Sequence, residues 1–287
     1  MQSAPTITLD SYEITLSPMT LGDVPRLHEL SIGVNWPHRP KDWMLLIELG
    51  EGFVARDEIG RILGSAMWFP MGERLASIGM VITSPRLQDQ GAGRWLMDHI
   101  LERVGARGKV LNATKAAYRL YLSMGFEPRQ TVYQYNGVVT ALPDGPAAAR
   151  RLREEDAGTI VALDAAAYGA SRSPVFERIL PVSEGTVIER AGRVCAFALC
   201  REFGRGHVVG PVVAETEEDA ITVIRPHVAA FKGRFLRMDT RAEDGPLRRF
   251  LEASGIPLYD TVTTMTRGEV PPPGPVTTYG LVNQALG

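Results

Sequence analysis

Residues 74–104 combine a strand, a glycine-containing turn and a helix in an order that suits anion binding. Residues 74–85 (RLASIGMVITSP) are predicted to form a strand, and residues 95–104 (WLMDHILERV) an amphipathic helix. Gly91 and Gly93 lie in the turn between them, where a ligand could approach the backbone closely. The free N–H groups of a first helical turn and the helix dipole both favour negative charge. The pattern therefore predicts a phosphate site, with a plain tight turn as the alternative.

The glycine pattern differs from two well-known phosphate loops. A dinucleotide-binding loop needs Gly-x-Gly-x-x-Gly and a P-loop ends in Gly-Lys-Ser/Thr, and residues 86–94 (RLQDQGAGR) contain neither. A second motif follows at a fixed distance. The two read, in order, Gln88-x-x-Gly91-x-Gly93 and Ala117-x-x-Leu120-Tyr121-x-x-x-Gly125-Phe126. In order and spacing they closely resemble the GNAT N-acetyltransferase family.

The resemblance implies an acetyl-CoA site along this stretch. It implies that the pyrophosphate is held by the backbone of Gln88, Asp89, Gln90, Gly91, Ala92, Gly93 and Arg94. It also implies that the pantetheine arm lies along Met80, Val81 and Ile82 and passes Thr114 and Ala117. Tyr121 would protonate the departing thiolate, a task that suits a phenol because a thiol and a phenol have similar pKa values. A half-buried helix tyrosine is the alternative interpretation.

Two positions depart from the family pattern. Many members carry Asn three residues before the alanine of the helix motif, where this chain has Thr114, whose hydroxyl could replace the amide. Many also carry a glutamate base on the strand before the phosphate loop, where this chain has Ser77 and Gly79. The nearest acid upstream is Glu73. Deprotonation of the acceptor through water is the expected substitute.

The two halves of the chain share an order of elements. Each begins with a strand, followed by an Asp suited to a helix N-terminus. A predicted hairpin comes next in each half. The first spans residues 52–68 and turns at 57–60, and the second spans residues 185–199 and turns at 191–192. Residues 140–149 (TALPDGPAAA) have the composition of a linker. We expect an α/β protein of two tandem GNAT-like domains with mixed sheets, at residues 1–142 and 143–287. A Pro-rich stretch begins the C-terminal tail, residues 271–287, which we expect to pack against the rest of the protein.

The second half lacks the chemistry of the first. After its strand at residues 207–214, residues 215–220 (ETEEDA) place four acids where a pyrophosphate would lie. Leu251 occupies the position aligned with Tyr121. We therefore expect the first domain to be catalytic and to bind acetyl-CoA. The second is expected to be a degenerate domain that serves structure or the acceptor pocket.

The acceptor is expected to lie near residues 34–43 (VNWPHRPKDW). Trp36 could form an apolar wall while His38 and Asp42 orient a charged acceptor, although tryptophans that merely cap the core would give the same pattern. Asp239, at the end of a strand in the second half, could bind an amine across the interface, with a neighbouring arginine for a carboxylate.

Charge and composition exclude some classes of binding partner. Residues 1–142 hold 14 Lys and Arg against 14 Asp and Glu, and the rest 17 against 19, so neither half has the basic excess of a nucleic-acid binder. The sequence shows no long apolar run and no secretory signal, so a cytoplasmic protein without a membrane partner is expected.

Cys195 and Cys200 are five residues apart on a predicted strand, so their side chains should point to opposite faces of the sheet. No histidine has ligand spacing, and no metal is expected. A homo-oligomer is compatible with this composition.

The expected function is transfer of acetyl from acetyl-CoA to the primary amine of a small metabolite, of amino acid, amino sugar or polyamine type, by direct attack. Protein-lysine acetylation is one alternative, and it would need an open groove. A non-catalytic acyl-CoA sensor is the other, and it would bind acetyl-CoA without turnover.

Overall fold

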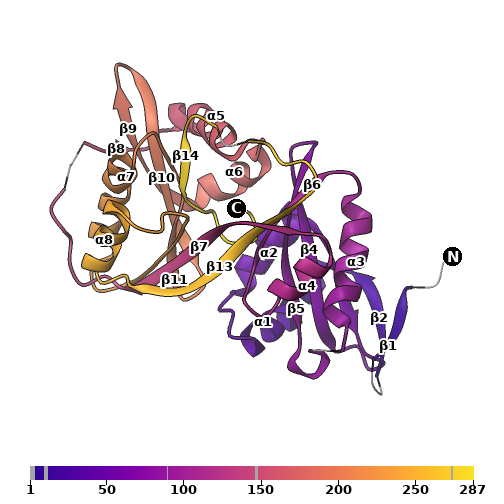
Figure 1. Cartoon of the computed structure of the whole chain (residues 1–287). Coiled ribbons are helices and arrows are strands. Elements are labelled where there is room, and N and C mark those ends of the chain that lie inside the picture. Colours follow the sequence, from indigo (N-terminus) through magenta and orange to yellow (C-terminus); the bar gives the residue numbers. More distant parts are fainter. Residues whose placement is uncertain (1–3, 10–11, 89, 146–147, 273) are drawn as a thin grey trace.

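The computed structural model describes all residues except 1–3, 10–11, 89, 146–147 and 273 (Figure 1). The first half contains, in order, β1 (Thr6–Leu9), β2 (Tyr12–Pro18), η1 (Leu21–Asp23), α1 (Val24–Gly33), α2 (Pro40–Leu49), β3 (Glu51–Arg56), β4 (Ile62–Met71), β5 (Leu75–Thr83), η2 (Pro85–Leu87), α3 (Ala92–Val104), β6 (Gly108–Ala113), α4 (Tyr118–Ser123) and β7 (Glu127–Val138).

The second half repeats this succession. It contains β8 (Arg150–Arg151), η3 (Glu154–Asp156), α5 (Ala157–Tyr168), α6 (Ser173–Ile179), η4 (Leu180–Val182), β9 (Ser183–Arg190), β10 (Arg193–Phe203), β11 (Gly206–Ala214), α7 (Glu217–Ala230), β12 (Phe235–Thr240), α8 (Pro246–Ala253), β13 (Leu258–Arg267) and β14 (Thr277–Gly280). None of the described helices is both long and apolar enough to cross a membrane.

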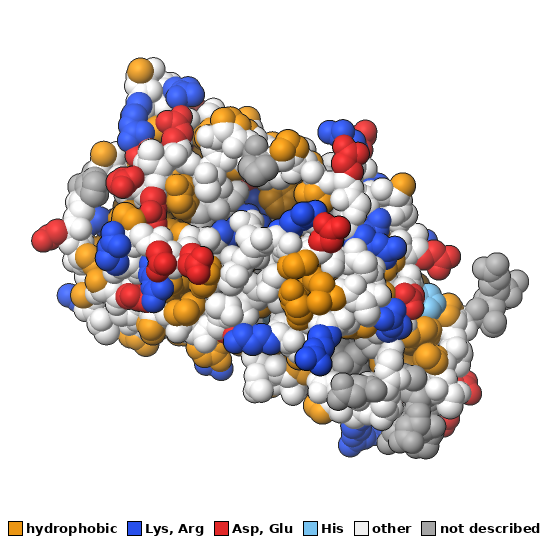
Figure 2. Space-filling model, in the orientation of Figure 1, with side chains coloured by type: hydrophobic (Ala, Val, Ile, Leu, Met, Phe, Trp, Pro, Cys, Tyr) orange, Lys and Arg blue, Asp and Glu red, His pale blue; other side chains and the backbone are white. Residues whose placement is uncertain are grey.

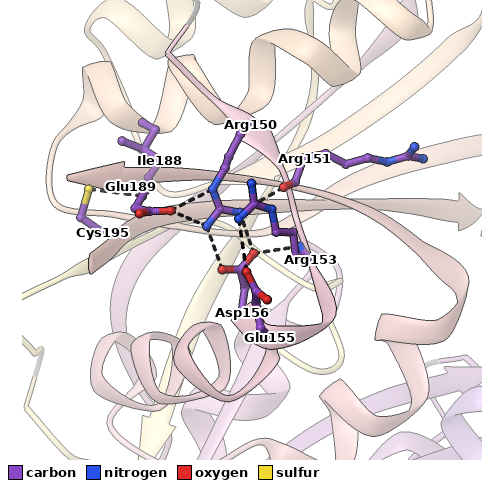
Figure 3. A network of polar contacts seen from close by, with 8 residues as sticks. All are labelled: Arg150, Arg151, Arg153, Glu155, Asp156, Ile188, Glu189 and Cys195. Atoms are coloured by element: carbon purple, nitrogen blue, oxygen red, sulfur yellow. Dashed lines mark hydrogen bonds and ion pairs between the residues drawn. The ribbon is translucent and has the colours of Figure 1, made fainter. Parts of the chain in front are cut away.

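An aspartate fixes the start of the helical segment in each half. Asp23 accepts a hydrogen bond from the N–H of Thr20 and pairs with Arg56 on β3. Asp156 likewise accepts from the N–H of Arg153, and Arg150 binds both of its oxygens (Figure 3). Each carboxylate closes a capping box at the 3₁₀ turn that begins the helical segment and ties this turn to a strand, so each predicted helix start has its aspartate in place.

Both predicted hairpins are confirmed. β3 and β4 are joined at Asp57–Gly60, where the N–H of Gly60 donates to the carbonyl of Asp57. β9 and β10 are joined by Ala191 and Gly192, both at positive φ, as a two-residue hairpin turn requires. The expectation for the cysteines was wrong. β10 carries a bulge between Val194 and Ala196, and Cys195 and Cys200 pack in the same core cluster.

The described strands form one continuous sheet in which the halves exchange a strand. The order is β1-β2-β3-β4-β5-β6-β13-β7-β12-β11-β10-β9-β8, with β14 beside β11. β13, from the second half, pairs with β6, while β7, from the first half, pairs with β12. β7 and β13 also pair with each other and cross the middle of the molecule (Figure 1).

Three core clusters hold helices on this sheet. One lies under α3 and α4 in the first half, and a second under α7 and α8 in the second half. The third is shared, because residues of α1 and α2 pack together with residues of α5 and α6 and with Val282 and Leu286 of the tail. The C-terminal end consequently lies at the centre of the molecule, and β1, the first described strand, lies at its outer edge (Figure 1). The tail docks, as expected.

The strand exchange predicts that the first half alone does not fold. In a fragment of residues 1–142, β7 would lose both of its strand neighbours, β13 and β12, and β6 would keep an open edge. Each buried backbone group left unpaired costs about 1–3 kcal/mol, so we expect the fragment to aggregate. Co-expression with residues 143–287 should restore a 1:1 complex in size-exclusion chromatography. A monomeric, folded 1–142 fragment would contradict the role given to the exchange.

Candidate functional site

A gap opens between two parallel strands of the first half. β5 and β6 pair from Leu75 and Gly108 as far as Ile78 and Leu111, and beyond that point they are no longer hydrogen-bonded to each other. The rest of β5 pairs only on its other side, with β4. Backbone groups of β5 beyond Ile78 are therefore available to a ligand that enters the gap.

A bulge sits at this gap. Gly79 pairs with Met67 and Ile82 with Ser65, so that Met80 and Val81 together oppose the one residue between, Ala66. Met80 has φ of 53°, unusual for a residue with a side chain, and its carbonyl accepts a hydrogen bond from Ser65 Oγ at 2.8 Å. Such strain is concentrated at functional sites, and a bulge redirects backbone groups out of the strand ladder.

The predicted phosphate turn forms the N-terminus of α3. Gly91 is its N-cap, with φ of 90°, and a Cβ built on it would meet no atom within 4 Å. The amides of Gln88 and Gln90 donate to the carbonyls of Thr83 and Arg86 and shape the turn. Gln88, Gln90, Gly91 and Arg94 are exposed, Gly93 is half-buried and Ala92 is buried. Asp89 lies outside the described residues. The exposed N–H groups at this helix start can receive an anion.

The helix motif lies on the α3 and α4 side of the gap. Ala117 is the N-cap of α4, and its N–H reaches Thr114 Oγ1 at 3.4 Å. Tyr121 is buried, with its ring edge-on to Phe126. It shares a core cluster with Ile78, the last β5 residue that pairs with β6. Burial raises the pKa of Tyr121, so its hydroxyl is protonated at neutral pH but is a weaker acid than a free tyrosine.

A cavity of about 240 Å³ lies on the other side of the gap, between the two halves. Its walls come from the α1–α2 loop, β5, the end of β6, β7, β13, the β10–β11 turn, β12 and the tail. Many of its lining side chains are amides: Asn35, Asn112, Gln134, Asn136, Asn283 and Gln284. Met80 and Thr114 also line it, so the cavity reaches the bulge. On the face shown in Figure 2, charges of both signs are interspersed.

The structure separates the four predicted acceptor residues into two pairs. Trp36 and His38 line the cavity. Asp42 does not; it is buried and accepts hydrogen bonds from the N–H of Arg39 and the N–H of Gly204. Asp239 does not line it either, since it is fully buried and its two oxygens bind Arg237. The two carboxylates orient residues of the wall instead of facing an acceptor.

His38 is a neutral side chain in this wall. Burial, followed by the charge of Arg237, lowers the pKa of His38 to about 4, against the opposing effect of Asp42. Its ring lies near Trp36, Trp43 and Phe203, with centroid distances of 5.4 to 6.2 Å. The imidazole is therefore uncharged at neutral pH and cannot attract an anion or repel an ammonium group by charge.

The tail contributes a wall that sequence reasoning missed. Ser77 Oγ donates to the carbonyl of Ala285 at 2.6 Å, and Asn112 Nδ2 donates to that of Gln284 at 2.7 Å. From the second half, Arg172 donates to the carbonyl of Leu286 at 2.8 Å. The only signal in the sequence was the apolar character of residues 279–287 after a Pro-rich stretch. This pattern indicates that the tail packs against the protein, but it does not indicate which surface the tail contacts.

The corresponding gap in the second half is filled. β11 and β12 pair only at His207–Leu236 and Val208–Arg237 before they diverge. Beyond that point β14 pairs with β11, from Val212 to Ala214, and the N–H of Leu281 donates to the carbonyl of Asp239 on β12. The chain's own backbone therefore occupies the position that stays open in the first half.

Acids occupy the start of α7, the helix that corresponds to α3. Thr216 is its N-cap and accepts from the N–H of Asp219, which pairs with Arg190. Glu217 accepts a hydrogen bond from the N–H of Leu247, at the start of α8. The Thr216 hydroxyl caps this helix start, and the negative charge of the acids beside it opposes binding of an anion. No group of three or more potential metal-binding side chains was found in the described part of the chain.

Comparison with known protein families finds the same kind of domain in both halves. Two models of an acetyltransferase (GNAT) domain match the chain, at residues 48–128 and 160–280. The N-acetyltransferase YitH of Bacillus subtilis (strain 168) is 27% identical over 258 residues, which cover 88% of this chain and 91% of that protein.

Solved structures show the same fold. An acetyltransferase structure from Pyrococcus horikoshii superposes with a TM-score of 0.81 at 16% identity and covers 96% of each chain. A tandem GNAT protein from the clavulanic acid biosynthesis pathway superposes with a TM-score of 0.63 at 15% identity, covering 88% of this chain and 98% of that one. At these identities the likeness shows the fold alone.

The contact between β5 and the tail predicts the effect of adding one methyl group. A Cβ on Gly79 would lie 2.7 Å from Ala285 Cβ and 3.0 Å from Ala285 Cα, so G79A must displace the tail. We expect it to lower the free energy of unfolding by about 1–3 kcal/mol in urea titrations, with partial recovery in the double variant G79A/A285G. The control is G158A on α5, where a Cβ meets nothing within 4 Å. Equal effects of G79A and G158A would contradict the contact.

Proposed function

The chain belongs to the GNAT family and is an acetyl-CoA-dependent acetyltransferase with two GNAT domains, and from this premise we propose that its acceptor is the primary amine of a small metabolite bound in the cavity between the halves. The observation that carries the proposal is the cavity itself. It is small, it is lined by both apolar and polar side chains from both halves, and it reaches the bulge at Met80. Peptide binding would instead call for an open groove.

The two substrates approach from opposite sides in this account. We assign acetyl-CoA to the α3 side, where the N-terminus of α3 receives its pyrophosphate and the gap between β5 and β6 receives its pantetheine arm. Met80 and Thr83 are three strand residues apart, about 10 Å, which gives the arm an extended backbone edge to follow. The fit rests on the open space at Gly91 and on the strand edge left unpaired beyond Ile78.

The proposed chemistry is a direct transfer. The amine nitrogen attacks the thioester carbonyl carbon, and the C–N bond forms as the carbonyl oxygen gains charge. Backbone N–H near Val81, redirected by the bulge, stabilises that oxygen. The C–S bond then breaks and the sulfur takes the proton of the Tyr121 hydroxyl. The nitrogen loses its own proton to water in the cavity, since Ser77 and Gly79 occupy the strand positions where many family members carry a glutamate. A proton from water then restores the Tyr121 hydroxyl, so no net proton is gained or lost.

We assign a structural part to the second domain. Its gap is filled by β14 and its helix start is occupied by acids, both of which oppose a second acetyl-CoA. It supplies Phe203, Arg205 and Arg237 to the acceptor cavity instead. A cytoplasmic location, without nucleic-acid or membrane partners, remains part of the proposal.

Charge at the α3 terminus should control acetyl-CoA affinity. We expect G91E to raise the KM for acetyl-CoA about tenfold or more, because the added carboxylate would lie where the pyrophosphate binds. The matched control is G105E at the other end of α3, where φ is also positive and a Cβ also meets nothing within 4 Å. The measurement is initial-rate kinetics of thiol release. Equal KM changes in the two variants would exclude this terminus as the phosphate site.

Removal of one hydroxyl tests the proton donor. We expect Y121F to lower kcat about 100-fold with the KM for acetyl-CoA changed less than about threefold, because the phenol acts only as the C–S bond breaks. Y118F on the same helix is the control. Full turnover by Y121F, with a melting temperature equal to that of the unmodified chain, would eliminate the acid role.

A further inference from the structure

One wall of the acceptor cavity presents a guanidinium group. Arg237 lines the cavity with 12% of its side chain exposed. Its Nε and Nη2 donate to the two oxygens of Asp239 at 3.1 and 2.7 Å. This buried pair fixes the plane of the guanidinium and uses only part of its five N–H groups. Nη1 has no hydrogen-bond partner within the described residues, so it is available to a ligand.

A second guanidinium, that of Arg201, lies against the same aromatic ring as Arg237. Arg201 is 3% exposed and donates to the carbonyls of Val282 and Glu202, but it pairs with no carboxylate in the described part of the chain. The Arg201 and Arg237 guanidiniums lie 5.3 and 5.4 Å from the ring centroid of Phe203, which lines the cavity. Burial lowers the pKa of Arg201 to about 10, so it stays charged at neutral pH. A buried charge without a counter-ion is costly.

Positive charge exceeds negative charge around the cavity. The cations are Arg39, Lys115, Arg201, Arg205 and Arg237, and the acids are Asp42, Glu202, Asp239 and Asp260. Arg39 binds both Asp42 and Glu202, Arg237 binds Asp239, and Lys115 lies 3.9 Å from Asp260. Arg205 is exposed and lines the cavity. Each of these acids therefore has a basic partner, and one unit of positive charge is left beside the cavity.

We propose that the acceptor carries an anionic group, a carboxylate or a phosphate, in addition to its amine. The proposal rests on the proposed function, since it concerns the acceptor of the same cavity. The anion binds the free edge of Arg237 with Arg205 beside it, and the amine points to the opposite wall, toward Met80. Guanidinium groups match the geometry of both anions, and an anion would balance the excess charge of this wall.

Matched acceptors test the proposal on the full chain. Thiol release at saturating acetyl-CoA is compared within pairs that differ by the anionic group: L-phenylalanine and phenethylamine, L-lysine and cadaverine, glucosamine 6-phosphate and glucosamine. We expect kcat/KM to be at least about tenfold higher for the anionic member of one or more pairs. The first two pairs test a carboxylate and the third a phosphate. Equal or better use of the neutral member in every pair would overturn the inference and leave the proposed function intact.

Variants show whether the arginines carry the preference. R205A should raise the KM for the anionic acceptor about tenfold, and the KM for its neutral counterpart much less, because only the anionic acceptor loses a charged partner. R193A, an exposed arginine at the other end of β10, is the control. R237K keeps a charge beside Asp239 but loses the planar fork, and should reduce the preference within the pair. An effect of R205A no larger than that of R193A, with R237K also retaining the preference, would overturn the assignment.

A binding measurement separates this inference from the proposed function. Absence of transfer to every amine would count against the proposed function. Thermal unfolding with inorganic phosphate or with benzoate does not depend on turnover, and either anion should raise the melting temperature of the unmodified chain more than that of R205A. No shift with either anion would overturn the inference whatever the activity.

Discussion

Two parallel strands that diverge leave backbone N–H and C=O groups that must find other partners, and this requirement arises twice in the chain. In the second half β14 meets it, because it pairs with β11 where β12 has turned away. In the first half none of the described strands enters between β5 and β6 beyond Ile78, and the bulge at Met80 lies there instead. One gap is closed by the chain and the other is open to ligands. The catalytic and structural parts that we propose for the two halves follow from that asymmetry.

The strand exchange and the tail turn two similar halves into one site. β13 and β7 each pair across the middle of the sheet, so neither half completes its sheet alone. The tail then runs from β14 into the centre, where it is held by Ser77 and Asn112 from the first half and by Arg201 from the second. A cavity made of eight segments can be shaped by substitutions in either half without altering the gap that we assign to acetyl-CoA.

Local features were predictable from the sequence, and long-range pairings were not. Both hairpins and the helix starts at Asp23 and Asp156 have short-range signals in turn residues and caps, and the structure has them where expected. The exchange of β7 and β13 has no such signal, because alternating strands fit either neighbour. The expectation that Cys195 and Cys200 face apart failed because a bulge inserts one residue and reverses the alternation.

The candidate site also has a part that local sequence signals predict and a part that depends on long-range contacts. The glycine turn before α3 and the motif around Tyr121 are contiguous, so their types and spacing could be interpreted directly. The acceptor wall is assembled from segments far apart in the sequence, and no sequence motif identifies Phe203, Gln134 or Asn283 as part of it. Asp239 was expected to face the acceptor as an acid near the interface. In the structure it is buried and bound by Arg237, and the guanidinium of Arg237 lines the cavity in its place.

The central claim is that only the first half binds acetyl-CoA, because β14 fills the equivalent gap in the second. Calorimetric titration of acetyl-CoA into the full chain measures this directly as a stoichiometry. The account predicts one site per chain. Two sites per chain would contradict it, since the second could be reached only if β14 left its place beside β11.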